Sequence, residues 1–164
     1  MTILDHATAA RLTQALAAGA QPTIAVLSDL FTSLPGIRTA TFIATAPDRT
    51  VTHRIGTSDP VHFPIGNVDP IDDGAWNRRI FGDRLPVIGN DVAGMAHFIP
   101  ETDQLVALNY GAIACFPILI AGDVRGVVAL LGDAGIFTPT TLADIASLLP
   151  TAALLFTFEG ISER

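Results

Sequence analysis

The last third of the chain constrains the fold most strongly. Residues 111–158 contain two nearly continuous apolar runs, joined by Ala121-Gly122-Asp123 and followed by a helix-forming segment. Apolar runs separated by a tight turn predict a hairpin of antiparallel strands, 112–120 and 124–131. Neither run alternates between apolar and polar residues, so both faces of these strands should be covered. The fold therefore needs a layer of other elements on each side of its sheet.

A helix is expected after this hairpin, from residue 138 toward Phe158. Thr138 is a suitable N-cap and Pro139 suits the first helical position. Pro150 lies inside the segment and should kink the helix or remove one of its hydrogen bonds. The apolar run 141–158 is shorter than the roughly 20 apolar residues of a membrane-spanning helix and contains polar residues, so it is interpreted as a buried helix rather than a membrane anchor.

Two helices are expected at the N-terminal end, within 4–34. The first covers 4–18, with Asp5 as a possible N-cap and Gly19 as a stop. The second has Pro22 at its first position, shows apolar residues at helical spacing, and ends at Pro35-Gly36.

The middle of the chain is less regular. Strands are expected at 37–46 and 50–56, followed by a stretch punctuated by Gly, Pro, Asn and Asp from 57 to 109. A long irregular segment inside a compact domain is usually functional. Within it we expect the following short elements: a helix at 73–82, a strand at 86–89, and helical turns at 91–98 and 101–109.

Composition excludes several classes of protein. The 164 residues carry a formal net charge of −7, which argues against non-specific nucleic-acid binding. All basic residues other than histidine are arginine, so a P-loop or a Schiff-base lysine is excluded. The single cysteine, Cys115, excludes an internal disulfide and a cysteine-based zinc site. The N-terminus has no signal-peptide pattern, so a cytoplasmic location is the default expectation.

The order of the expected elements resembles that of a GAF domain. The late part of that family's pattern is matched by Ala112, Pro117, Gly122-Asp123, Gly126 and Phe137-Thr138. The resemblance implies an α+β, GAF/PAS-like three-layer domain with a central antiparallel sheet of about five strands. The N- and C-terminal helices would cover one face, and short helices and loops the other. One domain would span 1–164, with helices at 4–34, the sheet and pocket segment at 37–132, and a last helix at 138–158.

The same resemblance implies a small-molecule-binding sensory or regulatory domain, with a pocket between the irregular segment and the sheet. A tryptophan face can stack on a ligand, and an arginine can hold a carboxylate or phosphate. No cofactor is expected. The residues predicted to surround the pocket are Phe42, Trp76, Arg78, Asn90, His97, Tyr110 and Cys115.

The second and last helices have apolar residues beyond a single stripe. Such helices are buried on more than one side, which in a small domain points to a second subunit. We therefore expect a homodimer formed through the N- and C-terminal helices. A signal would have to pass through the dimer or to a protein partner, and no nucleic-acid or membrane partner is expected.

Two other functions stay open. An enzyme on the same scaffold would act on a small carboxylate- or amide-bearing metabolite, with His97 or His53 as a base and Cys115 as a weak candidate nucleophile. A dimerisation module without a ligand is the third interpretation. No metal site is expected, because His53, His62 and His97 lack ligand spacing. Asp72-Asp73 and Asn90-Asp91 are interpreted mainly as helix caps.

Overall fold

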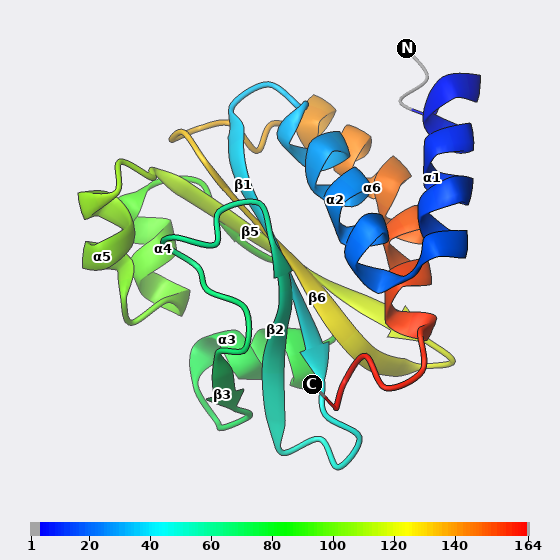
Figure 1. Ribbon diagram of the computed structural model, residues 1–164. Coiled ribbons are helices and arrows are strands. Elements are labelled where there is room, and N and C mark those ends of the chain that lie inside the picture. The colour runs from blue at the N-terminus through cyan, green and yellow to red at the C-terminus, as the bar shows by residue number, and fades with distance from the viewer. Residues whose placement is uncertain (1–3, 164) are drawn as a thin grey trace.

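The computed structural model describes residues 4–163 and contains one six-stranded antiparallel sheet between two helical layers (Figure 1). This confirms the predicted α+β three-layer fold. The domain prediction also covered residues 1–3 and 164, which lie outside the described part. The strands are β1 (Ile37–Thr45), β2 (Val51–Thr57), β3 (Val68–Pro70), β4 (Val87–Gly89), β5 (Ala112–Ile120) and β6 (Asp123–Gly132), in the spatial order β3-β2-β1-β6-β5-β4.

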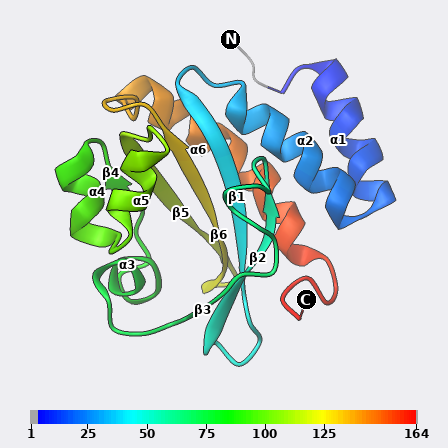
Figure 2. The ribbon, with the colours of Figure 1, turned by 60° about the vertical axis from the view of Figure 1, so that its left-hand side comes forward.

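The helices α1 (His6–Ala18), α2 (Ala20–Thr32) and α6 (Pro139–Ala153) lie on one side of the sheet, which we call the helix face. The opposite side, the far face, is covered by shorter elements (Figure 2). These are α3 (Ala75–Asn77), the π-helical turn η1 (Arg78–Gly82), α4 (Val92–Phe98) and α5 (Thr102–Ala107).

The C-terminal hairpin forms as expected. Ala121 and Gly122 form a two-residue turn in which both have positive φ, and Ile120 pairs with Asp123. Such turns match the twist of the flanking strands. Both strands are buried along most of their length, which confirms that both faces of the hairpin are covered.

The sheet has one strand more than the five predicted. The additional strand, β3, pairs with the outer edge of β2 through Val68–Pro70. All three of its residues are exposed, so the sequence shows no alternating apolar pattern there. A three-residue edge strand with a proline gives almost no local signal, because only the neighbouring strand provides its hydrogen-bond partners.

Two helix boundaries differ from prediction. The second helix begins at Ala20 rather than with Pro22 as its first residue, because the carbonyl of Gly19 accepts hydrogen bonds from both the N–H and the hydroxyl of Thr23. Pro22 then falls within the first turn, where no helical N–H is required. The last helix begins at the Thr138 cap as expected and passes through Pro150 to Ala153. It ends in a 3₁₀ turn, η2 (Leu154–Thr157).

Candidate functional site

The far face of the sheet is closed by a cluster of apolar side chains that we call the far-face cluster. Ile80 of η1 and Met95 of α4 are fully buried in it, together with Val87 of β4 and Val127 of β6. The other buried members are Leu105, Tyr110, Ile113, Cys115, Ala129 and Leu131. The centre of the far face, where the sequence analysis placed a pocket, is therefore filled by side chains.

The structure separates the seven residues predicted to surround the pocket. Trp76, Tyr110 and Cys115 do lie together in or against the far-face cluster. Phe42 lies on the other side of the sheet, where its ring packs 6.2 Å from that of Phe31 in α2. Residues of β1 alternate between faces, so a residue two positions from Ala40 and Ala44 shares their helix-side orientation.

Arg78, His97 and Asn90 are not part of this cluster. Arg78 and His97 are exposed. Neighbouring Arg79 is half-buried, and its Nε donates a hydrogen bond to the carbonyl of Pro86. Asn90 links the end of β4 to the segment before α6, because its Oδ1 accepts a 3.0 Å hydrogen bond from the N–H of Phe137. Asp91 caps α4 through the N–H of Gly94, as predicted.

Cys115 has the chemistry of a core residue. Burial raises the pKa of its thiol to about 12, and the neighbouring Trp76 indole only partly opposes this shift. A thiol with such a pKa is almost entirely protonated near neutral pH, whereas the thiolate is the nucleophile. Within residues 4–163, no hydrogen bond joins Cys115 to a histidine. The structure therefore provides no activated cysteine.

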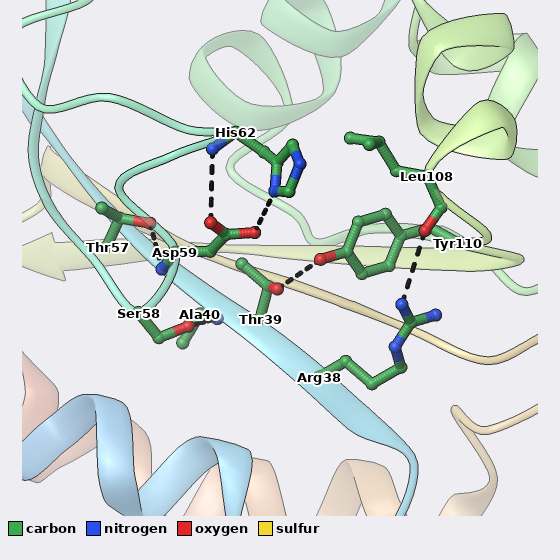
Figure 3. A network of polar contacts seen from close by, with 9 residues as sticks. All are labelled: Arg38, Thr39, Ala40, Thr57, Ser58, Asp59, His62, Leu108 and Tyr110. Carbon is green, nitrogen blue, oxygen red and sulfur yellow. Dashed lines mark hydrogen bonds and ion pairs between the residues drawn. The ribbon is translucent and has the colours of Figure 1, made fainter.

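A polar network fixes one end of the far-face covering to the sheet (Figure 3). The hydroxyls of Tyr110 and Thr39 are 2.5 Å apart and both side chains are buried. The Arg38 guanidinium lies 4.5 Å from the centre of the Tyr110 ring and donates to the carbonyl of Asn109. The Thr39 contact occupies the Tyr110 hydroxyl, and the contacts together anchor the chain just before β5 to β1.

Asp59 and His62 form a second part of this network. The carboxylate of Asp59 lies 2.7 Å from Nδ1 of His62 and also accepts the N–H of that residue. The hydrogen bond with the His62 side chain is the main cause that lowers the pKa of Asp59 below its ordinary value. Among residues 4–163, no three His, Cys, Asp or Glu side chains gather closely enough to hold a metal ion.

A hollow of about 150 Å³ opens where the covering segment meets the end of the sheet. This end hollow lies where β1 ends and β6 begins, away from the filled centre of the far face. Its lining residues are Thr45, Arg49, Ile71, Phe81, Arg84, Asp123 and Val124. None of the seven residues predicted from the sequence lines it.

The polar groups of the end hollow are unevenly paired. Arg49 forms a 2.6 Å ion pair with Asp123. Arg84 makes no ion pair or side-chain hydrogen bond with any residue in 4–163. Thr45 is only 7% exposed, and its buried hydroxyl oxygen has no hydrogen-bond partner within the described residues. Buried hydroxyls are normally paired, so this one lacks the hydrogen bond that its burial usually requires.

Sequence reasoning missed the end hollow because its walls come from four separate stretches of the chain: 45–49, 71, 81–84 and 123–124. Arg49 and Arg84 both have positive φ and occupy tight turns, in the sequences PDRT and FGDRLP. The turns themselves could be recognised from the sequence. Their convergence could not, because it depends on which strand ends lie side by side.

Two other features of the molecule are a surface depression near the N-terminus and a long apolar helical segment. An open depression of about 520 Å³ lies at Leu4–Ala7, but Asp5, His6 and Ala7 are exposed and it borders residues outside the described part. The helical segment Pro139–Thr157 is long and apolar enough to cross a membrane by length and composition alone. Buried core helices pass the same test, and Ile145, Leu148 and Leu155 of this segment are buried against the rest of the domain.

Comparison with known proteins identifies the fold. No family model matches the sequence, and no curated protein is similar to it in sequence. Solved structures do match. The GAF domain of an Acinetobacter phosphoenolpyruvate-protein phosphotransferase is 8% identical, with a TM-score of 0.66 over 93% of this chain and 94% of its own.

Two other GAF structures are similar to a comparable extent. The GAF/HD domain protein from Geobacter sulfurreducens is 16% identical, with a TM-score of 0.68 over 85% of this chain and 93% of its own. A phycocyanobilin-bound GAF domain from a cyanobacterial phytochrome is 14% identical, with a TM-score of 0.64 over 92% and 94%. Residues 4–163 of this chain therefore have the fold of a GAF domain.

Proposed function

We propose that this protein is a sensory or regulatory domain that binds a small organic molecule at the end hollow. The observation that carries the proposal is the combination of an unpaired arginine, Arg84, with a buried unpartnered hydroxyl, Thr45, in one concave site. Concave sites with a few convergent polar groups among apolar walls are the usual form of a ligand site. One of the similar structures is a GAF domain with phycocyanobilin bound, which supports ligand binding by this fold.

The position of the end hollow also suits a regulatory role. Its walls include the turn between β1 and β2 at Arg49, the turn η1 before Arg84, and the start of β6 at Asp123. A bound molecule would contact all three segments and favour the arrangement in which they lie together. A ligand shifts a conformational equilibrium by this kind of differential contact.

We also propose that the protein acts as a homodimer through its N- and C-terminal helices. Only about a third of the apolar segment Pro139–Thr157 is buried within one chain, which supports a second layer over it. Its outward residues include Ala143 and Ala146, whose small size would let another helix approach closely. A protein partner for the signal and a cytoplasmic location remain predictions from the sequence.

The dimer is tested by light scattering on the full chain. The expected mass is twice that of the 17.2 kDa chain. Ala143→Glu should shift the population toward monomer, because the new charge would be buried at the interface. A wild-type protein that remains a monomer at high concentration contradicts the dimer.

Native mass spectrometry of freshly purified full-length protein tests the binding proposal. The expected spectrum contains an additional mass of a small molecule that is lost on collisional activation. A broad metabolite screen by thermal unfolding supports this test, since any ligand that binds only the folded state raises the melting temperature. The proposal is wrong if the protein is free of any co-purified molecule and no metabolite of any charge raises its melting temperature.

A dimerisation module without a ligand is the second candidate function. The filled centre of the far face favours it, because Ile80, Val87 and Met95 occupy the space in which the sequence analysis expected a ligand. This alternative predicts a dimer in light scattering together with negative results in both binding experiments. The enzyme interpretation has less support, since Cys115 is buried and His97 is exposed.

A further inference from the structure

We propose that the ligand of the end hollow is a small organic oxyanion that carries a short apolar group. This inference rests on the proposed function, since it names the chemical class of the molecule that binds at that site. Three properties of the hollow support it: its local charge, its unpartnered hydroxyl, and the apolar side chains of its remaining walls.

The local charge of the hollow is positive in a chain that is acidic as a whole. The net charge of the chain is −7. Of the three charged groups that line the hollow, two are guanidinium groups, Arg49 and Arg84, and one is the carboxylate of Asp123. Two positive charges and one negative charge leave one positive charge over. A singly charged anion would complete the balance.

The charged groups also allow an anion to be exchanged. The side chains of Arg49 and Asp123 are 62% and 42% exposed, and exposed ion pairs contribute little net free energy. A ligand oxyanion can therefore bind Arg49 together with Asp123, or replace the Asp123 carboxylate as the partner of Arg49. Arg84 offers a second guanidinium fork that no residue in 4–163 occupies. Guanidinium groups bind carboxylate and phosphate oxygens through paired hydrogen bonds.

The buried hydroxyl of Thr45 favours the same class of ligand. Thr45 precedes the Arg49 turn on β1, and its side chain lies on the far face with that of Ile43. Its oxygen has almost no accessible surface, so an oxyanion would reach it only after neighbouring side chains shift. The hydroxyl could then donate the hydrogen bond that it lacks in the described structure.

The remaining walls set the size and character of the rest of the molecule. Ile71, Phe81 and Val124 are apolar. A volume of about 150 Å³ is well below the roughly 300–1,000 Å³ typical of sites for drug-sized ligands. The hollow therefore suits a small branched or aromatic acid and is too small for a nucleotide or a tetrapyrrole.

The experiment compares isovalerate, its neutral amide isovaleramide, and inorganic phosphate, by calorimetric titration of the full chain at constant ionic strength. Isovalerate should bind at least tenfold more tightly than isovaleramide, because the amide lacks the charge. Phosphate binding as tight as that of isovalerate would overturn the inference, because phosphate has no apolar group to contact Ile71, Phe81 and Val124. Equal binding of isovalerate and isovaleramide overturns the inference but leaves the proposed binding of a small molecule intact. The absence of binding by all three probes has the same two consequences.

Three variants locate the site. Arg84→Asn removes the unpaired charge while tolerating the positive φ of 58° at this position, and should weaken isovalerate binding about tenfold. Arg125→Gln is the matched control, because Arg125 is an exposed arginine of β6 that does not line the hollow. It should leave the affinity within about twofold. Equal losses in both variants would reveal only a general charge effect and would overturn the site.

Thr45→Val gives a readout that a merely structural role would not produce. Removing an unpartnered buried hydroxyl should raise the melting temperature of the free protein by about 2–4 °C. The same change should weaken isovalerate binding severalfold. A variant that is less stable than wild type, or one that keeps full affinity, contradicts the role assigned to the hydroxyl.

Discussion

The two faces of the sheet are covered by different means. On the helix face, long amphipathic helices place a continuous apolar stripe over the sheet, and Phe31, Phe42 and Phe156 are almost fully buried. On the far face, short helices and turns pack on a smaller apolar cluster and are also attached by individual polar contacts. These contacts are Thr39–Tyr110, Arg38–Asn109 and Asn90–Phe137.

The exposed apolar side chains show the same contrast. Nine large hydrophobic residues are markedly exposed in the described structure, and seven of them lie in 57–110. The short elements of this segment cannot hide every apolar residue, and where they meet the end of the sheet they leave the hollow open. Long helices bury their apolar residues against the sheet, whereas the short elements of the far face leave several apolar side chains exposed. Four measurements can break or sharpen this contrast.

The largest effect should come from the helix face. Phe42→Ala should lower the free energy of unfolding by about 3–5 kcal/mol, since Phe42 is fully buried among rigid helices. Met95→Ala on the far face should cost about 2–3 kcal/mol, because turns and short helices can relax more readily around the lost side chain. Urea unfolding measures both. Leu119→Ala, at a 45% exposed position, is the control and should change stability by less than about 0.5 kcal/mol. Equal losses at Phe42 and Met95 would show that both faces are equally rigid.

The next effect tests how closely α4 is seated on β4. A Cβ added to Gly89 would lie 2.6 Å from the backbone nitrogen of Met95, which cannot move without shifting the helix. Gly89→Ala should therefore destabilise the fold by about 1–3 kcal/mol. Gly82→Ala is the matched control on the same segment, because an added Cβ there has no neighbour within 4 Å. If Gly89→Ala is as stable as wild type in thermal unfolding, α4 is only loosely attached.

The polar attachment of the far face is tested by a double-mutant cycle. Tyr110→Phe leaves the buried hydroxyl of Thr39 without its partner and should cost about 1–2 kcal/mol. Adding Thr39→Val removes that unpaired group and should recover much of the loss. Additive losses in the two single variants would mean that the hydroxyl pair contributes nothing specific.

The smallest effect is a dependence of stability on pH at Asp59. Its pKa is lowered in the folded state, chiefly by the hydrogen bond with His62. The stabilisation is therefore fully present above the ordinary carboxylate pKa and is lost as the pH falls through the lowered value. Wild type should exceed Asp59→Asn in stability at pH 6, and the difference should shrink as the pH falls below the ordinary carboxylate pKa and through the lowered one. A difference that is independent of pH would rule out this contribution.

Much of the fold could be predicted from the sequence, because its signals are local. The Thr138 cap, the Ala121-Gly122 turn and the unbroken apolar runs on either side of that turn each act within a few residues. The edge strand Val68–Pro70 could not be predicted, because the edge of β2 alone makes those residues a strand. The candidate site was predicted less well. Trp76, Tyr110 and Cys115 were placed on the correct face, yet they fill it.

The sequence by itself determined the layers of this protein: where strands and helices form, and which segments are apolar enough to be covered on both sides. The sequence also pointed to 57–110 as the segment that decides function, but Thr45, Arg49 and Asp123 of the end hollow lie outside it. Only the tertiary structure decided that Thr45, Arg49 and Arg84 meet in one hollow. The physical reason is that caps, turns and periodicity act over short distances along the chain. A site formed by the ends of β1 and β6 depends on the pairing of strands about 80 residues apart, as between Ile43 and Val127.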